Sequence, residues 1–125
     1  MARLGELERA VMEVLWSAPD SCTARDIVAA LPDRELAATT VLTVLSRLER
    51  KDLVSRDRDS RAHRYRPTAT REQHAATLMR EALDTAEDRS AALASFAEQV
   101  SPGEAEELAA SLAEALHRRS AARDG

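Results

Sequence analysis

Residues 35–67 read ELAATTVLTVLSRLERKDLVSRDRDSRAHRYRP, and this stretch predicts the fold of the chain. Successive helix residues are rotated by about 100°, so residues three or four positions apart share a face. In a helix over residues 38–51, one such face is apolar: Val41, Val44, Leu45 and Leu48. The other side collects polar and basic residues: Thr39, Thr43, Ser46, Arg47 and Arg50. The pattern predicts an amphipathic helix that buries one face and presents the other.

The polar face of this helix suits the chemistry of the DNA major groove. A threonine methyl group can contact the thymine methyl group, and its hydroxyl can donate or accept a hydrogen bond. An arginine can bind guanine through two hydrogen bonds. An ordinary solvated helix face is the alternative, and for an isolated helix it would be the better interpretation. The flanking sequence decides between the two.

Two further helices are predicted upstream. Apolar residues at helical spacing predict a first helix over residues 4–17, which ends before Pro19. Thr23 is the predicted N-cap of a second helix over residues 24–31, with Asp26 in the capping-box position. Three helices joined by short turns are typical of a helix-turn-helix, in which the last helix reads the groove.

Two short strands are predicted after the third helix, over residues 53–58 and 63–66, around a turn at Asp59-Ser60. Three residues are predicted to face the core: Leu53, Val54 and Tyr65. The arginines are predicted to stay exposed: Arg56, Arg58, Arg61, Arg64 and Arg66. Residues 44–67 carry eight basic and four acidic side chains, so we expect this hairpin, or wing, to contact DNA phosphates.

Three more helices are predicted in the second half, over about residues 70–86, over 90–99, and from Pro102 onward. Ser101 caps the last one, and residues 118–125 are expected to form a frayed polar tail. Little of this chain remains to cover the apolar residues of these helices, so we expect a second copy to do so. The predicted dimerisation residues are Leu78, Leu83, Leu93, Phe96, Leu108, Leu112 and Leu116. A monomer whose helices fold back on the first domain is the alternative.

The predicted fold class is therefore mainly α with a small β-hairpin wing. A winged helix-turn-helix domain is expected over residues 1–69 and a helical dimerisation domain over residues 70–125. The net charge of −4 conceals an asymmetry between the two halves. Residues 1–67 carry 12 basic and 11 acidic side chains, whereas residues 68–125 carry 6 and 11. The acidic half is expected to stay away from DNA.

Composition excludes several other classes of protein. Cys22 is the only cysteine, so no intramolecular disulfide is possible. The histidines His63, His74 and His117 are far apart, and no nucleophile with a matching base is evident. We therefore predict no metal site, no cofactor and no enzymatic activity. No apolar run approaches membrane length, so we expect no membrane insertion and a cytoplasmic location.

Several motifs occur together along most of the chain. They are Leu7-Glu8, Val11-Met12, Leu15-Trp16, Thr39-Thr40-Val41, Thr43-Val44-Leu45, Arg47-Leu48, Lys51, Leu53-Val54, Arg64-Tyr65, Pro67, Phe96 with Glu98, and Glu106-Glu107-Leu108. With these motifs, from about Gly5 to Leu116, the chain resembles the penicillinase repressor family (BlaI/MecI type) of bacterial transcriptional repressors.

The resemblance implies a homodimer that binds a dyad DNA operator with TACA/TGTA half-sites and represses a promoter. β-Lactam resistance or cell-envelope genes would be the regulated targets. It assigns base contacts to Thr40, Thr43 and Arg47, whereas Thr39 and Leu42 stand where some relatives carry lysine and arginine. The predicted DNA-binding residues are thus Thr39, Thr40, Thr43, Arg47, Arg50, Lys51, Arg58, Arg61 and Arg64.

In the family, repression is relieved when a membrane-bound metalloprotease sensor cleaves an Asn-Phe bond. Ser95-Phe96 stands at that place, so the resemblance implies cleavage there; the alternative is that Phe96 is a dimer-core aromatic residue. Trp16 is predicted to be a core residue packed on the wing or on the connector. The alternative function is a helical adaptor that uses the winged scaffold to bind protein, and it would lack the strong salt dependence of DNA binding.

Overall fold

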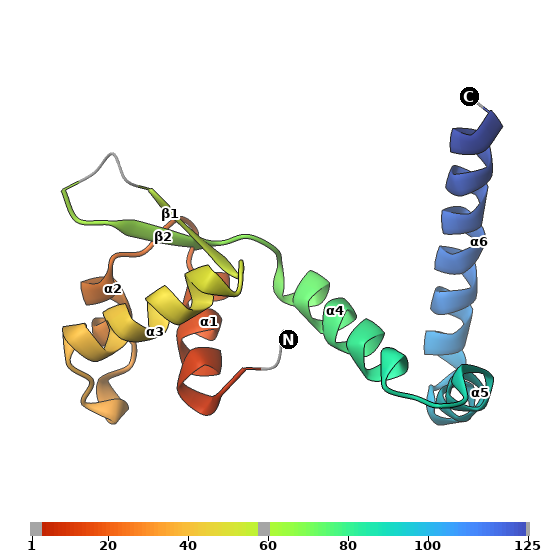
Figure 1. Cartoon of the computed structure of the whole chain (residues 1–125), viewed down its shortest axis with the longest axis horizontal. Coiled ribbons are helices and arrows are strands. Elements are labelled where there is room, and N and C mark those ends of the chain that lie inside the picture. The colour runs from red at the N-terminus through yellow and green to blue at the C-terminus, as the bar shows by residue number, and fades with distance from the viewer. Residues whose placement is uncertain (1–3, 58–60, 125) are drawn as a thin grey trace. The chain divides into compact units, whose positions relative to one another are not determined.

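The computed structural model describes residues 4–57 and 61–124. The described part is mainly helical with one two-stranded antiparallel hairpin, as predicted (Figure 1). The elements, in order, are α1 (Glu6–Ser17), α2 (Ala24–Ala30), the short 3₁₀ helix η1 (Pro32–Arg34), α3 (Ala38–Arg50), β1 (Val54–Asp57), β2 (Arg64–Pro67), α4 (Arg71–Asp84), α5 (Arg89–Gln99) and α6 (Pro102–Asp124).

The helices α1, α2 and α3 and the hairpin enclose one hydrophobic core. Its most deeply buried side chains are Val11, Met12, Leu15, Ile27, Val41, Leu45 and Leu48. The four apolar residues predicted for the inner face of α3 are all buried there, which confirms the helical pattern. Since α3 packs against both α1 and α2, its orientation is set by two helices at once.

The hairpin register explains why one predicted exposure is wrong. Arg56 pairs with Tyr65, and directly paired residues point to the same face of an antiparallel sheet. Tyr65 is buried in the core, as predicted, so Arg56 is drawn to the core side and is half-buried. Its Nε lies 3.8 Å from Oε2 of Glu49 on α3, and this ion pair links the hairpin to the helix.

The ends of several elements differ from the sequence prediction. The 3₁₀ helix η1 lies one residue after α2, in a stretch for which the sequence predicted no helix. At the other end, α6 continues to Asp124, so the prediction of a frayed tail from residue 118 is wrong. The residues 118–124 read RRSAARD and contain neither glycine nor proline, and alanine and arginine favour the helix.

The first turns of α4 are attached to the winged body through Trp16. Its indole Nε1 donates a 3.0 Å hydrogen bond to the carbonyl oxygen of Ala69, between β2 and α4, and its side chain is partly buried against the core. The ring centroid of Trp16 lies 5.4 Å from that of the buried His74. The guanidinium of Arg71 lies 5.6 Å from the same ring and pairs with Glu13 at 2.6 Å. Trp16 therefore makes an aromatic contact with His74 and a cation–π contact with Arg71, which in turn forms the ion pair with Glu13.

The chain divides into two compact units, residues 1–81 and 82–125. The division lies within α4, later in the chain than the predicted boundary between residues 69 and 70. The contact between Trp16 and His74 joins the start of α4 to the first unit. The assignment of a separate dimerisation domain stays a prediction. Between residues 82 and 124, no side chain is buried.

Candidate nucleic-acid interface

The outer face of α3 is presented to solvent as the sequence predicts. The three predicted base-contacting residues, Thr40, Thr43 and Arg47, are all exposed. Thr39, Ser46 and Arg50 are exposed as well, and so is Leu42, at 42%. The opposite face is packed in the core, since Val41, Leu45 and Leu48 each have 0% exposure. These exposed side chains are therefore carried on a helix that has no freedom to rotate about its axis.

The hydroxyl group of Thr43 already has an intrahelical partner. Its Oγ1 donates a 3.0 Å hydrogen bond to the carbonyl oxygen of Thr39, one turn earlier. The proton is thus engaged, while the oxygen keeps lone pairs that can accept a hydrogen bond. Toward a base, Thr43 can accept from an exocyclic amino group or contact a methyl group, but it donates only if the intrahelical bond breaks.

Lys51, at the end of α3, lies on a carboxylate of α1. Its Nζ donates to both oxygens of Glu8, at 2.9 and 3.1 Å. Burial of Glu8 would raise its pKa. The hydrogen bonds from Lys51 and the Gly5 amide, with the nearby charges of Lys51 and Arg47, outweigh that and hold the pKa below its usual 4.5. This contact fastens α3 to α1, and the predicted role of Lys51 in DNA binding stays a prediction.

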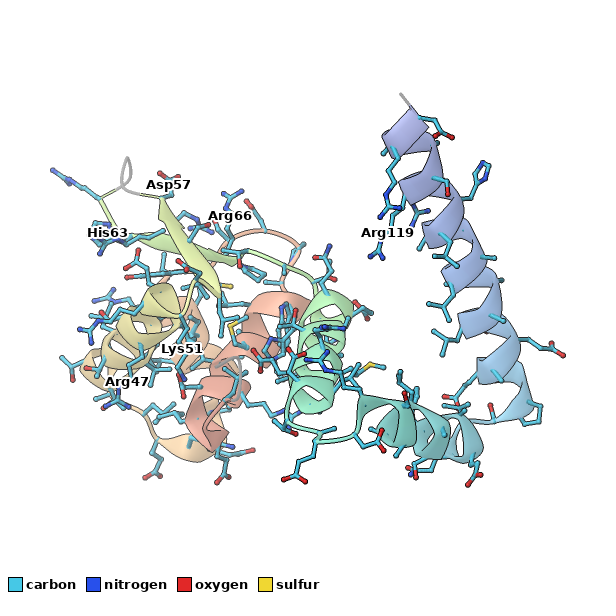
Figure 2. The ribbon with its side chains drawn as sticks, turned by 45° about the vertical axis from the view of Figure 1, so that its right-hand side comes forward. Arg47, Lys51, Asp57, His63, Arg66 and Arg119 are labelled. Atoms are coloured by element: carbon cyan, nitrogen blue, oxygen red, sulfur yellow. The ribbon has the colours of Figure 1, made fainter. Side chains whose placement is uncertain are left out.

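The hairpin that follows α3 carries exposed basic side chains as well. Arg61, His63 and Arg66 are exposed, and Figure 2 shows Arg47 extending from α3 and His63 and Arg66 from the hairpin. Arg66 was not among the predicted DNA-binding residues, although its alternation with buried Tyr65 in β2 was enough to find it. The predicted contact residue Arg58 and the predicted turn at Asp59-Ser60 lie outside the described residues.

Arg64 is half-buried, so its predicted exposure is wrong. Its Nε donates to Oγ of Ser21 and its Nη2 to the carbonyl oxygen of Ser21, each at 2.7 Å. Ser21 lies 43 residues earlier, between α1 and α2, and is only 7% exposed. Sequence reasoning missed Ser21 because no local pattern marks a residue whose partner lies so far along the chain. The role of Arg64 as a direct DNA contact stays a prediction.

The predicted dimerisation residues are all at least partly exposed within one copy. Leu78 and Leu83 of α4 are half-buried. The others lie on α5 and α6 and are exposed to the following extents: Leu93 53%, Phe96 40%, Leu108 42%, Leu112 54% and Leu116 63%. The predicted cleavage pair Ser95-Phe96 lies inside α5, and both residues are exposed.

The described residues offer little that would hold a cofactor. No group of three or more metal-ligating side chains is found among them. Cys22 is buried, and burial, with the charge of Asp26, raises the pKa of its thiol, which disfavours the reactive thiolate. A depression of about 500 Å³ between α1, β2 and α4 is open and lined by charges of both signs, among them Asp20, Arg66 and Glu72. None of the helices described is both long and apolar enough to cross a membrane.

The chain is similar to known proteins over most of its length. The sequence profile described as "Penicillinase repressor" matches residues 4–114. Two relatives, each named transcriptional regulator BlaI and from Mycobacterium tuberculosis strains CDC 1551 / Oshkosh and ATCC 25618 / H37Rv, are 51% identical over 118 residues. The alignment covers 91% of this chain and 86% of each relative.

Among solved structures, a MarR family transcription regulator shares the fold with a TM-score of 0.50 and 25% identity. The similarity covers 96% of this chain and 74% of that one. The sequence relatives are transcriptional regulators and not enzymes. The winged-helix fold and the exposed polar face of α3 are in line with that class of protein. The chain belongs to the penicillinase repressor family of transcriptional regulators.

Proposed function

We propose that the protein is a dimeric, sequence-specific DNA-binding repressor that acts on dyad operators. Each copy would place α3 in the major groove of a TACA/TGTA-like half-site. The observation that carries the proposal is the contrast between the two faces of α3. Thr43 and Arg47 are exposed while Val41 and Leu45 are completely buried, so the core holds the reading side chains in fixed positions.

Base reading and backbone contact are divided between two elements in this proposal. Thr40, Thr43 and Arg47 face base edges, where Arg47 can bind guanine through two hydrogen bonds. Thr39 and Arg50 flank them on the same helix. The exposed arginines of the hairpin, Arg61 and Arg66 together with the sequence-predicted Arg58, contact phosphates, which hold the complex in register without reading sequence.

The apolar side chains of α5 and α6 support a homodimer. Leu93, Leu112 and Leu116 are each more than half exposed, and every Å² of apolar surface removed from water contributes about 25 cal/mol. A second copy presents the same surface, so a two-fold interface covers both at once. The resulting pair of α3 helices matches a palindromic operator with half-sites about one helical turn apart.

Relief of repression by proteolysis fits the position of Ser95-Phe96. The bond lies in α5, and few buried contacts hold this helix within one copy, so it opens locally at low cost. A cut there would separate α6 from the winged body and weaken dimerisation. The corresponding partner is a membrane-bound metalloprotease sensor, and the repressor itself would act on chromosomal DNA in the cytoplasm.

DNA binding over a range of salt concentrations tests the proposal. Fluorescence anisotropy with a TACA/TGTA dyad duplex and a scrambled duplex should show preference for the dyad. A dimer that makes six to ten phosphate contacts should lose about 10³–10⁵ in affinity between about 50 and 200 mM salt. A wild-type protein that ignores the dyad and shows no salt dependence would instead favour the adaptor function.

A charge on α6 tests the dimer separately. Leu112→Asp buries an unpaired carboxylate in the proposed interface, so sedimentation should show a monomer and the dyad preference should be lost. Ala110→Asp is the matched control, because residue 110 lies on nearly the opposite side of the helix from Leu112. Dimerisation that survives Leu112→Asp would rule out this face of α6 as the interface.

A further inference from the structure

A fork of two hydrogen bonds fastens the hairpin to the loop between α1 and α2. Arg64 donates from Nε to the hydroxyl oxygen of Ser21 and from Nη2 to its carbonyl oxygen, both at 2.7 Å. The charged, planar guanidinium holds both acceptors in one geometry, which a single flexible donor cannot do. Ser21 is 7% exposed, so its side of the contact is inside the protein.

The backbone beside this fork is paired as well. The amide of Cys22 donates to the carbonyl of Tyr65 at 2.9 Å, and the amide of Tyr65 donates to the carbonyl of Cys22 at 2.7 Å. Both residues are buried. Cys22 therefore forms a β-bridge with Tyr65, and the segment Ser21-Cys22 is fixed to β2 by two backbone bonds and two side-chain bonds.

The hairpin depends on this attachment for its position. An isolated two-stranded hairpin is at best marginally stable in water, and β1 and β2 form a two-stranded sheet to which the bridge from Cys22 to Tyr65 is added. Arg66 is carried by β2, two residues beyond Arg64, and Arg61 precedes the strand. If the fork at Ser21 is broken, the strand that carries these exposed cations loses one of its anchors.

We propose that Ser21 and Arg64 are positioning residues for DNA binding, which set the place of the hairpin cations without contacting DNA themselves. The inference rests on the proposed function, because it requires that Arg61 and Arg66 contact phosphates. It assigns a part in binding to an uncharged, buried serine. It also removes Arg64 from the direct phosphate contacts that the sequence predicts.

The salt dependence of binding separates a positioning role from a direct contact. Each phosphate bound by a cation contributes about 0.9 to the slope of log K against log salt, so the release of one phosphate by each protomer lowers the slope of a dimer by about 1.8. Ser21→Ala removes no charge, yet it should lower the slope by about that amount on a TACA/TGTA dyad duplex and on a scrambled duplex. Ser111→Ala, which removes an exposed hydroxyl from α6 in the second unit, should leave the slope unchanged.

Arg64→Lys provides a second, independent variant. It keeps the positive charge but cannot form the fork, so a positioning role predicts that the slope falls, as in Ser21→Ala. A direct phosphate contact would survive the change to lysine. Circular dichroism checks that each variant is folded before binding is measured, since loss of stability alone does not alter the slope of the folded protein.

The outcomes separate the inference from the proposed function. Wild-type slopes in both Ser21→Ala and Arg64→Lys, with a lower slope in Arg64→Ala, would overturn the inference and make Arg64 a direct contact. Lower slopes in the first two variants support it. A wild-type protein without salt-dependent DNA binding would overturn the proposed function itself, whatever the variants do.

Discussion

The two units of this chain use similar helical sequences but bury them to very different extents. In the first unit, α1, α2, α3 and the hairpin cover one another, and Val11, Ile27 and Leu45 have 0% exposure. In the second, Phe96 is 40% and Leu116 63% exposed. An apolar stripe stabilises a helix only when something covers it. The first unit supplies its own cover, whereas in the proposed dimer a second copy covers the apolar side chains of the second unit.

Charge follows the same division. Residues 1–81 have one more basic than acidic side chain, whereas residues 82–125 have five more acidic than basic side chains. Exposed basic residues occur on several elements of the first unit, and those on α3 and the hairpin include Arg47, Arg61 and Arg66. A protein with an acidic total can therefore still bring a local positive surface to DNA.

The largest expected effect tests which unit folds by itself. Leu45→Ala leaves a cavity in the enclosed core and should cost about 2–5 kcal/mol. Leu112→Ala truncates a side chain that is 54% exposed, so it should affect dimerisation rather than the winged body. Trp16, the only tryptophan, reports unfolding of the first unit by fluorescence in urea. Equal shifts of the urea transition of Trp16 in Leu45→Ala and Leu112→Ala would contradict this difference between the two units.

A smaller effect is expected for one arginine of the reading face. Arg47→Ala should cost about 1–3 kcal/mol per half-site and relax base preference at one position. Arg119→Ala is the control, because Arg119 is an exposed arginine of α6 in the second unit (Figure 2). Competition between the dyad and scrambled duplexes measures the preference. An unchanged preference in Arg47→Ala would exclude a base contact by this residue.

Helix caps provide a matched pair, one in each unit. The amide of Asp26 donates to Oγ1 of Thr23 at 3.1 Å, and the amide of Glu104 donates to Oγ of Ser101 at 3.1 Å. Thr23→Ala should destabilise the first unit by about 1 kcal/mol and lower the urea midpoint of Trp16 fluorescence. Ser101→Ala should fray α6, seen as reduced ellipticity, and leave that midpoint unchanged. A shift of the midpoint in Ser101→Ala would mean that the units unfold together.

The smallest effect concerns pH. The pKa of Glu8 is lowered in the folded state, so its contribution to stability is present above about pH 4.5 and is lost as pH falls through the folded value. The stability difference between wild type and Glu8→Gln should therefore shrink between about pH 6 and about pH 3. The pKa of Glu104 is lowered too, by hydrogen bonds from Ser101, but that contact is local to α6. A constant difference across this range would show that the Glu8–Lys51 pair does not stabilise the first unit.

Local patterns predicted most of the fold. The inner face of α3, the Thr23 cap and the hairpin were all found from spacing alone, because helix and strand periods act over a few residues. One detail that failed depends on a neighbour that is not local, and another on local composition that was misjudged. Arg56 was expected to be exposed, but its pairing with Tyr65 turns it inward. The end of α6 was expected to fray, although its composition favours helix to Asp124.

The amino-acid sequence alone determined the amphipathic helices, the polar face of α3 and the shortage of cover in the second half, since each follows from the order of residue types. Only the tertiary structure decided which basic side chains have a partner far along the chain. Lys51 reaches Glu8 and Arg64 reaches Ser21, in each case a partner 43 residues away. Such pairs form because folding brings distant segments within about 3 Å, the range at which charged hydrogen bonds act. Periodicity carries no information about that distance.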